Sequence, residues 1–386
     1  MPRSPVRARF RMHQSKPKLI AYYLPQYHAI PENDEWWGKG FTEWTNVAKA
    51  QPLFRGHRQP RFPADLGYYD LRVPEVREQQ AELARRYGIS GFCYYHYWFG
   101  DGRRLLERPF NEVVGSGRPD FPFCLCWANE TWRGIWFGST TPNVLVEQTY
   151  PGKKDYEMHF EFLRPAFEDD RYIRIDDKPV FQVLLPHAIP DLGLFTDTFR
   201  RRAEKCGLKG LYLLTSRGPL DWDPRSHDFD GVVGSEFSHL RYVSAIYYSR
   251  NNFVNRMKWR IQNRLGLKPD FDLQNRNAPI VLEYREAIRH FIGKTPMGFD
   301  YFPCVVPNWD NTARAGRKAL ILVNSTPELW KQHLQDGMEA VRHLPPERRM
   351  VMIKSWNEWA EGNYLEPDSE HGHRYLEVIQ QALAES

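Results

Sequence analysis

The chain has 386 residues, of which 41% are hydrophobic and 26% are charged. This composition is that of a globular protein, and no run of eighteen apolar residues suggests a transmembrane helix. The length excludes a small sandwich and fits one large α/β barrel or two medium domains.

The charge of the chain is distributed unevenly. The net charge is +5, but residues 1–18 contain six basic residues and no acidic one, which leaves −1 for the remainder. We expect a basic, disordered leader over residues 1–18. The alternative is a segment that attaches loosely to anionic lipid headgroups. No basic stripe continues into the folded part, which argues against nucleic-acid binding. No apolar signal segment is present, so we expect a cytoplasmic protein with peripheral membrane contact.

The aromatic content is the unusual part of the composition. Aromatic residues make up 15% of the chain, with 13 Trp and 20 Tyr. Tyr and Trp combine an apolar face with a polar edge, which suits both protein cores and surfaces that bind sugars. The five cysteines are scattered and lack the spacing of a zinc site. We therefore expect free thiols, no metal and no cofactor.

Apolar and β-branched runs alternate with amphipathic stretches along the chain. The predicted strands are Leu19–Pro25, Ile89–Trp98, Phe121–Ala128, Pro179–Leu185, Gly210–Thr215, Gly231–Phe237, Phe302–Trp309 and Met350–Trp356. The predicted helices are Pro74–Tyr87, Lys154–Phe167, Leu192–Cys206, Pro327–His343 and Arg374–Ala384. Such an alternation is typical of a parallel sheet covered by helices.

The number of strands favours one architecture. Eight strand–helix units match an α/β fold of the (β/α)8 TIM-type barrel class. A doubly wound open sheet is the alternative, but no Gly-x-Gly-x-x-Gly motif follows the first strand. We expect a single barrel domain over residues 19–386, with long loops after strand 1 (Gln26–Val73) and strand 6 (Ser238–Tyr301). The second loop contains a basic helical stretch around residues 255–264. Connections of this length are usually functional loops or accessory units.

Polar and aromatic residues follow nearly every predicted strand. The active site of such a barrel lies at the carboxyl ends of its strands, so these residues are candidates for substrate binding. They are Tyr27, His28, Tyr95, His96, Trp98, Trp127, Asn129, Glu130, Glu236, Trp309, Asp310, Asn357 and Trp359. Each one alone is as readily a core residue, but together they are the residue types of a sugar site.

The strongest local signal follows the eighth strand, in the segment Asn357–Gly362. Here Glu358 and Glu361 are three residues apart and are flanked by Trp356 and Trp359. Chemistry at a glycosidic bond needs a carboxylic acid to protonate the leaving oxygen and a carboxylate on the other side. Two carboxyl groups that share a partly buried pocket move apart in pKa, which supplies both forms. The alternative is a pair of glutamates at a helix N-terminus.

At these residues the chain resembles a known family. It is similar to the WbsX-like proteins, which are related to the glycoside hydrolase family 99 endo-α-mannosidases. The resemblance spans about Leu19 to Val378 and is carried by Leu24–Gly38, Gly40–Asn46, Gly91–Trp98, Trp127–Glu130, Trp309–Thr312 and Asn357–Asp368. The second of these segments adds Trp44 to the candidate substrate-binding residues.

The resemblance implies a (β/α)8 barrel and retaining chemistry. In family 99 the first Glu of the Asn-Glu-Trp-x-Glu-Gly motif deprotonates the sugar 2-hydroxyl, so that a 1,2-anhydro sugar forms. The second Glu is the general acid and then the general base. Carried over to this chain, Glu358 takes the first role and Glu361 the second. WbsX-like proteins are also associated with the biosynthesis of O-antigen and other cell-surface polysaccharides, and are often labelled glycosyltransferases.

Three functions are consistent with these observations. The first is a retaining endo-glycosidase or transglycosylase that acts on an oligosaccharide. The second is a cytoplasmic glycosyltransferase of polysaccharide assembly, which would act on a lipid-linked glycan. The third is a non-catalytic glycan-binding barrel. The presence of both glutamates argues against the third, because binding alone does not require a matched acid and base.

Overall fold

The computed structural model describes residues 16–134, 143–216, 223–234, 257, 278–292 and 298–386. The predicted leader lies outside the described residues, apart from its last three residues. Of these, Lys18 already belongs to the first strand. The basic stretch around residues 255–264 also lies outside the described residues, except for Met257.

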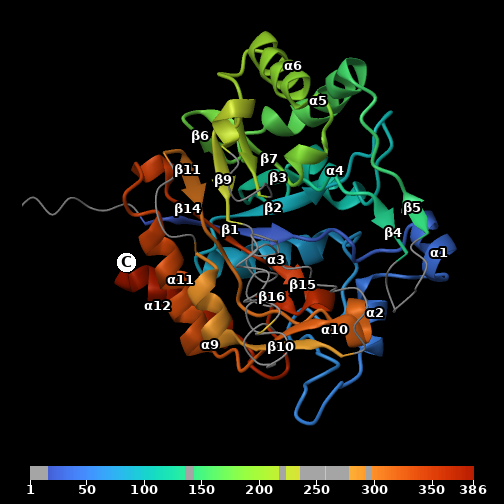
Figure 1. Ribbon diagram of the computed structural model, residues 1–386, viewed down its shortest axis with the longest axis vertical. Coiled ribbons are helices and arrows are strands. Elements are labelled where there is room, and N and C mark those ends of the chain that lie inside the picture. Colours follow the sequence, from blue (N-terminus) through green and yellow to red (C-terminus); the bar gives the residue numbers. More distant parts are fainter. Residues whose placement is uncertain (1–15, 135–142, 217–222, 235–256, 258–277, 293–297) are drawn as a thin grey trace, which may run out of the picture.

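A nearly closed parallel barrel forms the centre of the protein (Figure 1). Each predicted strand run overlaps a barrel strand. These strands are β1 (Lys18–Tyr23), β2 (Gly91–His96), β3 (Phe123–Trp127), β7 (Lys178–Val183), β8 (Tyr212–Thr215), β9 (Gly231–Val233), β11 (Asp300–Phe302) with β12 (Cys304–Val305), and β14 (Met350–Ile353). Strands that follow one another around the barrel pair in parallel, and β1 also pairs with β14, as a TIM-type barrel requires.

The seventh barrel strand is divided at Pro303, and its two halves pair with different neighbours. β11 pairs with β9, whereas β12 pairs with β14. Pro303 cannot donate a hydrogen bond, but its carbonyl accepts one from the Met352 N–H at 2.9 Å. The prediction placed the start of this strand at Phe302. The strand begins at Asp300, inside the stretch that we expected to be a loop.

Helices surround the barrel. They are α3 (Pro74–Arg86), α4 (Arg108–Ser116), α5 (Lys153–Phe167), α6 (Leu192–Lys205), α11 (Pro327–Ala340) and α12 (Arg374–Glu385). Each of the five predicted helices begins within one residue of its expected start. Pro74 and Pro327 occupy the first turn, where a missing N–H costs nothing, and Thr326 caps α11 by accepting a hydrogen bond from the Leu329 N–H. The prediction missed α4, which is short.

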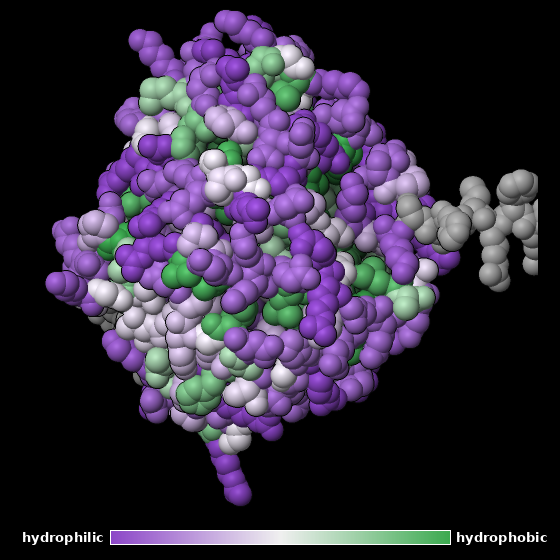
Figure 2. All heavy atoms as spheres, turned by 180° about the vertical axis from the view of Figure 1, so that it is seen from behind, coloured by the Kyte–Doolittle hydropathy of each residue, from purple (hydrophilic) through white to green (hydrophobic). Residues whose placement is uncertain are grey.

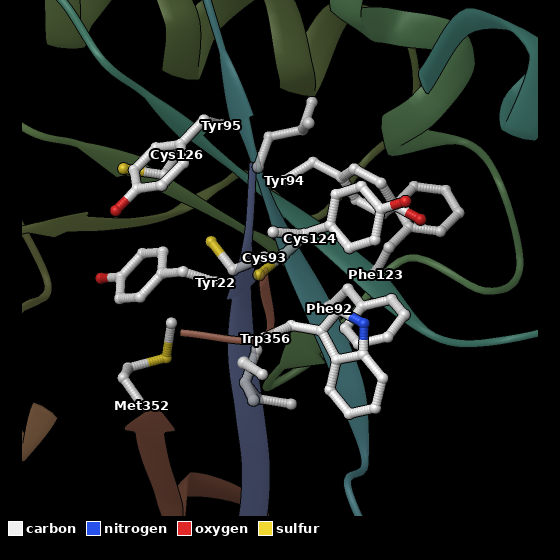
Figure 3. Packing of buried hydrophobic residues seen from close by; sticks show 14 of the residues in the cluster. Tyr22, Phe92, Cys93, Tyr94, Tyr95, Phe123, Cys124, Cys126, Met352 and Trp356 are labelled. Carbon is white, nitrogen blue, oxygen red and sulfur yellow. The ribbon is translucent and has the colours of Figure 1, made fainter. Parts of the chain in front are cut away.

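Side chains alternate between the two faces of the barrel strands (Figure 3). Tyr22 and Tyr95 point to the interior, where their rings stack with centroids 5.4 Å apart. The Tyr22 hydroxyl donates to the side chain of Gln182 at 2.9 Å, across the barrel. Phe123, on the outer face, packs against Phe110 of α4. The five cysteines are free, and four of them are buried.

Both long connections contain secondary structure that the sequence did not predict. The first holds α1 (Pro31–Trp37) and α2 (Glu43–Lys49). The second holds β10 (Ile280–Glu283) and α9 (Tyr284–Ala287), and β10 pairs in parallel with β13 (Leu320–Val323). This small sheet has a hydrophobic core of its own, which includes Leu282 and Trp309. Each of its strands is a run of four residues whose partner lies far along the chain, so periodicity could not identify it.

Further short elements include the hairpin strands β4 (Trp132–Arg133) and β5 (Val144–Val146), the edge strand β6 (Arg174–Ile175), α10 (Thr312–Ala315), β15 (Asn357–Glu358), the 3-10 turn η7 (Trp359–Glu361) and β16 (Asn363–Tyr364). The β4–β5 hairpin lies beside α1 (Figure 1), where the rings of Trp36 and Trp132 meet edge to face.

The face opposite the view of Figure 1 is mostly hydrophilic, with hydrophobic residues distributed among the polar ones (Figure 2). Within the described ranges, every helix is too short or too polar to cross a bilayer.

Gly337 tests how closely α11 packs on the barrel strands β12 and β14. A Cβ at this position would lie 2.7 Å from Cγ1 of Val305 and 3.3 Å from Cγ1 of Val351. We expect Gly337→Ala to lower the free energy of unfolding by about 1–3 kcal/mol, because overpacking outweighs the gain in helix propensity. Gly193→Ala in α6 is the matched control, since nothing lies within 4 Å of its added Cβ. Urea unfolding measures the free energy of unfolding of both variants. Equal values for Gly337→Ala and Gly193→Ala would contradict the close packing of Gly337.

Candidate active site

The two glutamates lie on a tight hairpin that follows the eighth barrel strand. β15 and β16 pair antiparallel, and η7 joins them. Gly362 ends the turn at a φ of +64°, in the left-handed region that glycine tolerates. An added Cβ there would lie 2.8 Å from the backbone N and O of Asp310. The pair therefore occupies a compact turn and not the first turn of an α-helix.

Hydrogen bonds from the first strand hold this hairpin in place. The Asn357 side chain accepts from the Leu24 N–H at 2.7 Å and donates to the Leu24 carbonyl at 3.1 Å. The Tyr27 hydroxyl donates to the Asn357 carbonyl and accepts from the Trp359 N–H at 3.2 Å. The end of β1 thus fixes the backbone on which both glutamates are carried.

Glu358 is buried beside a lysine. Its side chain is 4% exposed, and Nζ of Lys354 lies 3.1 Å from its Oε2. The same ammonium group donates to the Tyr95 hydroxyl at 3.0 Å and lies over the rings of Tyr95 and Trp309. Burial raises the pKa of Glu358 to about 7, against the opposing charge of Lys354 and with the help of the charge on Glu361.

Glu361 is held by an arginine instead. Its Oε1 lies 2.7 Å from Nη1 of Arg314, which α10 contributes. Burial alone would raise the pKa of Glu361, but the charges of Arg314 and Lys354 hold this pKa below its ordinary value. The two carboxyl groups therefore differ in pKa, and just below pH 7 the pair holds one proton, mainly on Glu358.

The buried carboxyl group of Glu366 connects the hairpin to neighbouring segments. Glu366 accepts hydrogen bonds from Nε1 of Trp359 at 2.6 Å, Nε2 of Gln80 at 2.6 Å and the Tyr69 hydroxyl at 2.9 Å. Burial raises its pKa to about 7, although these donors oppose the change. Trp44, another candidate, packs against the rings of Tyr69 and Trp359 and donates through Nε1 to the Tyr69 carbonyl.

Several candidates face the outer helices and are not brought to the pair. The His96 imidazole contacts that of His159 on α5, with 2.8 Å between their Nε2 atoms. Trp98 donates to Asp155 of the same helix at 3.1 Å. Trp127 packs between His159 and Phe195. In each case the strand places the neighbouring side chain in the barrel and this one outside it.

Other candidates connect loops. Asn129 accepts from the Leu185 N–H at 2.8 Å and donates to the Leu185 carbonyl at 2.8 Å, which joins the ends of β3 and β7. Asp310 accepts from Nε2 of His57 at 2.9 Å. Burial would raise the pKa of Asp310, but this hydrogen bond and the charge of Arg61 hold it at about 2.

The remaining candidates are a histidine and two acids. His28 is buried, and burial lowers its pKa to about 4. Glu130 is partly exposed beyond β3. Glu236 lies outside the described residues.

Four residues near the pair escaped the sequence analysis. They are Glu43, Tyr97, Arg314 and Lys354, all of which interact electrostatically with Glu358 or Glu361. Lys354 could have been found, because it follows inward-facing Met352 by two residues on the eighth strand. Arg314 and Glu43 could not, since each lies on a short helix whose position only the folded chain defines.

Solved structures share this fold. A protein described as glycoside hydrolase-like superimposes with a TM-score of 0.56 at 15% identity, over 98% of this chain and 97% of its own. The GH99 endo-α-mannosidase of Bacteroides thetaiotaomicron gives a TM-score of 0.55 at 12% identity, over 95% and 96% of the two chains. Identities this low show a common fold alone. The TIM-type barrel expected from the sequence is thereby confirmed.

Comparison of sequences assigns the chain to a family. Residues 19–379 match the family described as Glycosyltransferase WbsX, and the chain belongs to this family. Proteins named "Uncharacterized protein WxcX" from two strains of Xanthomonas campestris pv. campestris are 38% and 37% identical over 366 residues. These residues are 95% of this chain but 49% of those proteins, so the chain spans about half the length of the curated relatives that it matches.

Gly362 tests the geometry of the hairpin that carries Glu358 and Glu361. We expect Gly362→Ala to lower the free energy of unfolding by about 3 kcal/mol, because it adds a contact with the backbone of Asp310 to the left-handed strain. Gly372→Ala is the matched control: its φ is also positive, but nothing lies within 4 Å of the added Cβ. Thermal unfolding compares the two variants. A loss no larger at Gly362 than at Gly372 would contradict the close approach.

Proposed function

We propose that the protein acts on glycosidic bonds with retention, as an endo-glycosidase or transglycosylase. Glu358 is the base toward the sugar 2-hydroxyl, and Glu361 is the general acid and then the general base. The observation that carries the proposal is the pair itself: two buried carboxyl groups on one hairpin, each with its own cation and with pKa values displaced in opposite directions.

The single proton of the pair suits this chemistry, although it is bound to Glu358 and the proposed general acid is Glu361. In the empty site Glu358 holds the proton and Glu361 is ionised. A sugar hydroxyl that donates to Glu358 stabilises its ionised form, and a glycosidic oxygen that accepts from Glu361 stabilises its protonated form. A bound glycan therefore favours transfer of the single proton from Glu358 to Glu361, which produces the reactive arrangement.

A second candidate is a glycosyltransferase of cell-surface polysaccharide biosynthesis that acts on a lipid-linked glycan. The family to which the chain belongs favours it, since its description is that of a glycosyltransferase. The same two glutamates would then serve transfer to an acceptor hydroxyl in place of water. Incubation with oligosaccharides alone, and with an added glycan acceptor, separates the two functions. Release of free sugar supports hydrolysis, and a lengthened acceptor supports transfer.

Replacing the two glutamates tests their catalytic role. We expect Glu358→Gln and Glu361→Gln each to lower kcat/KM on a cleaved oligosaccharide by roughly 10²–10⁴-fold, since proton transfer in the transition state contributes this much. Glu347→Gln, an exposed glutamate before β14, is the control and keeps full activity. Glu361→Gln also keeps more activity on glycosyl fluorides, because fluoride leaves without a proton. Undiminished cleavage by either variant would refute the assignment.

The pH dependence tests the shared proton. Activity requires one proton on the pair, so it should fall as the pH rises through about 7, where Glu358 ionises. It should fall again at low pH, where the pair takes up a second proton. Lys354→Met removes the cation that favours ionised Glu358, so the alkaline limb of kcat/KM moves to higher pH. Lys318→Met, at an exposed position, is the control. If the alkaline limb of Lys354→Met stays at the same pH, the charge of Lys354 does not control the ionisation of Glu358.

A further inference from the structure

Arg314 connects Glu361 to a third carboxylate. Its Nη1 lies 2.7 Å from Oε1 of Glu361, and its Nη2 lies 3.0 Å from Oε1 of Glu43. Glu43 belongs to α2, in the long connection after β1, and is fully buried. The helices α2 and α10 pack against each other and against η7, so the three charged groups come from three separate segments.

The two carboxyl groups that Arg314 contacts differ in their exposure to solvent. Glu43 has no access to solvent, and leaving its charge uncompensated by Arg314 would carry a large cost in free energy. The side chain of Glu361 is 15% exposed, so water or a substrate can take the place of the arginine at its carboxylate. Glu43 thus fixes Arg314, and Arg314 in turn offers one N–H group to Glu361.

We propose that Arg314, fixed by Glu43, is the positioning residue that keeps Glu361 ionised in the empty site and so assigns the proton of the pair to Glu358. The other charged groups that face Glu361 are Glu358, on the same hairpin, and Lys354, at the end of β14. Lys354 contacts Glu358 and Tyr95, whereas Arg314 is in direct contact with Glu361. The inference deepens the proposed function, on which its catalytic meaning rests.

The arrangement also indicates how a substrate changes the proton's position. When a glycosidic oxygen reaches Glu361, Arg314 remains paired with Glu43 and its contact with Glu361 loosens. One proton then leaves the Glu358 carboxyl group and binds the Glu361 carboxylate, so the net charge of the pair is unchanged. Arg314 and Glu43 touch neither the sugar nor the reacting atoms in this scheme. Both act on Glu361, and the charge of Arg314 also lowers the pKa of Glu358, to a smaller extent than that of Lys354 does.

Carboxyl titration measures this role without any substrate. In protein labelled with ¹³C at the glutamate side-chain carboxyl, the resonances of the pair are assigned with Glu358→Gln and Glu361→Gln and followed against pH. We expect Arg314→Met to raise the pKa of Glu361 by about one to three pH units, since it removes an opposite charge in contact. In Arg314→Lys the pKa of Glu361 should lie between its values in the unaltered protein and in Arg314→Met. Arg317→Met, at an exposed position three residues along, is the control and leaves the titration unchanged.

Glu43→Gln supplies an independent second arm. It removes a like charge near Glu361 but keeps an amide oxygen that can still accept from Arg314, so the pKa of Glu361 falls or stays low. The two variants therefore have opposite effects, which a general loss of structure would not produce. A rise in this pKa in Glu43→Gln, or an unchanged pKa in folded Arg314→Met, would overturn the proposal. If Arg314→Met does not fold, Arg314→Lys and Glu43→Gln decide.

Kinetics then separates this inference from the proposed function. If the proposed function holds, the acidic limb of kcat/KM in Arg314→Met moves to higher pH together with the titration, and added guanidinium ion moves it back. A shifted titration with no glycan turnover by the unaltered protein would support the role of Arg314 and refute the proposed function. Glycan turnover by the unaltered protein, together with an unchanged pKa of Glu361 in Arg314→Met, would support the proposed function and refute the role of Arg314.

Discussion

The structure of the site depends on the double hydrogen bond between the Asn357 side chain and the backbone of Leu24. It continues the pairing of β1 with β14 beyond the end of both strands, at the place where the chain must leave the barrel and turn. Tyr27 adds its hydroxyl to the same turn. Because a buried amide satisfies both backbone groups, the hairpin that carries the two glutamates has one defined position.

Burying several charges together has a physical cost that the protein meets by pairing. Glu358 lies against Lys354, and Arg314 lies between Glu43 and Glu361. Each cation removes part of the desolvation penalty of its partner, but unequally, and the pKa values of the two glutamates separate as a result. The same charges that allow the site to be buried therefore determine which carboxyl group carries the proton.

Much of the fold was predictable because its signals are local. The eight apolar runs and the starts of five helices, such as Pro74 and Pro327, depend on residues adjacent in the chain. The candidate site was less predictable, because polar residues at strand ends alternate between two faces. Tyr95 points into the barrel and neighbouring His96 points to α5, a difference that depends on the register of the strand.

The sequence by itself determined the barrel class, the family and the candidate pair, since each rests on short-range spacing or on a motif. Only the tertiary structure decided what surrounds Glu358 and Glu361. Lys354 directly follows β14 and is four residues from Glu358, but Arg314 and Glu43 come from short helices after the seventh and first strands. Contacts between segments so distant in the chain arise from barrel closure, and no local pattern encodes them.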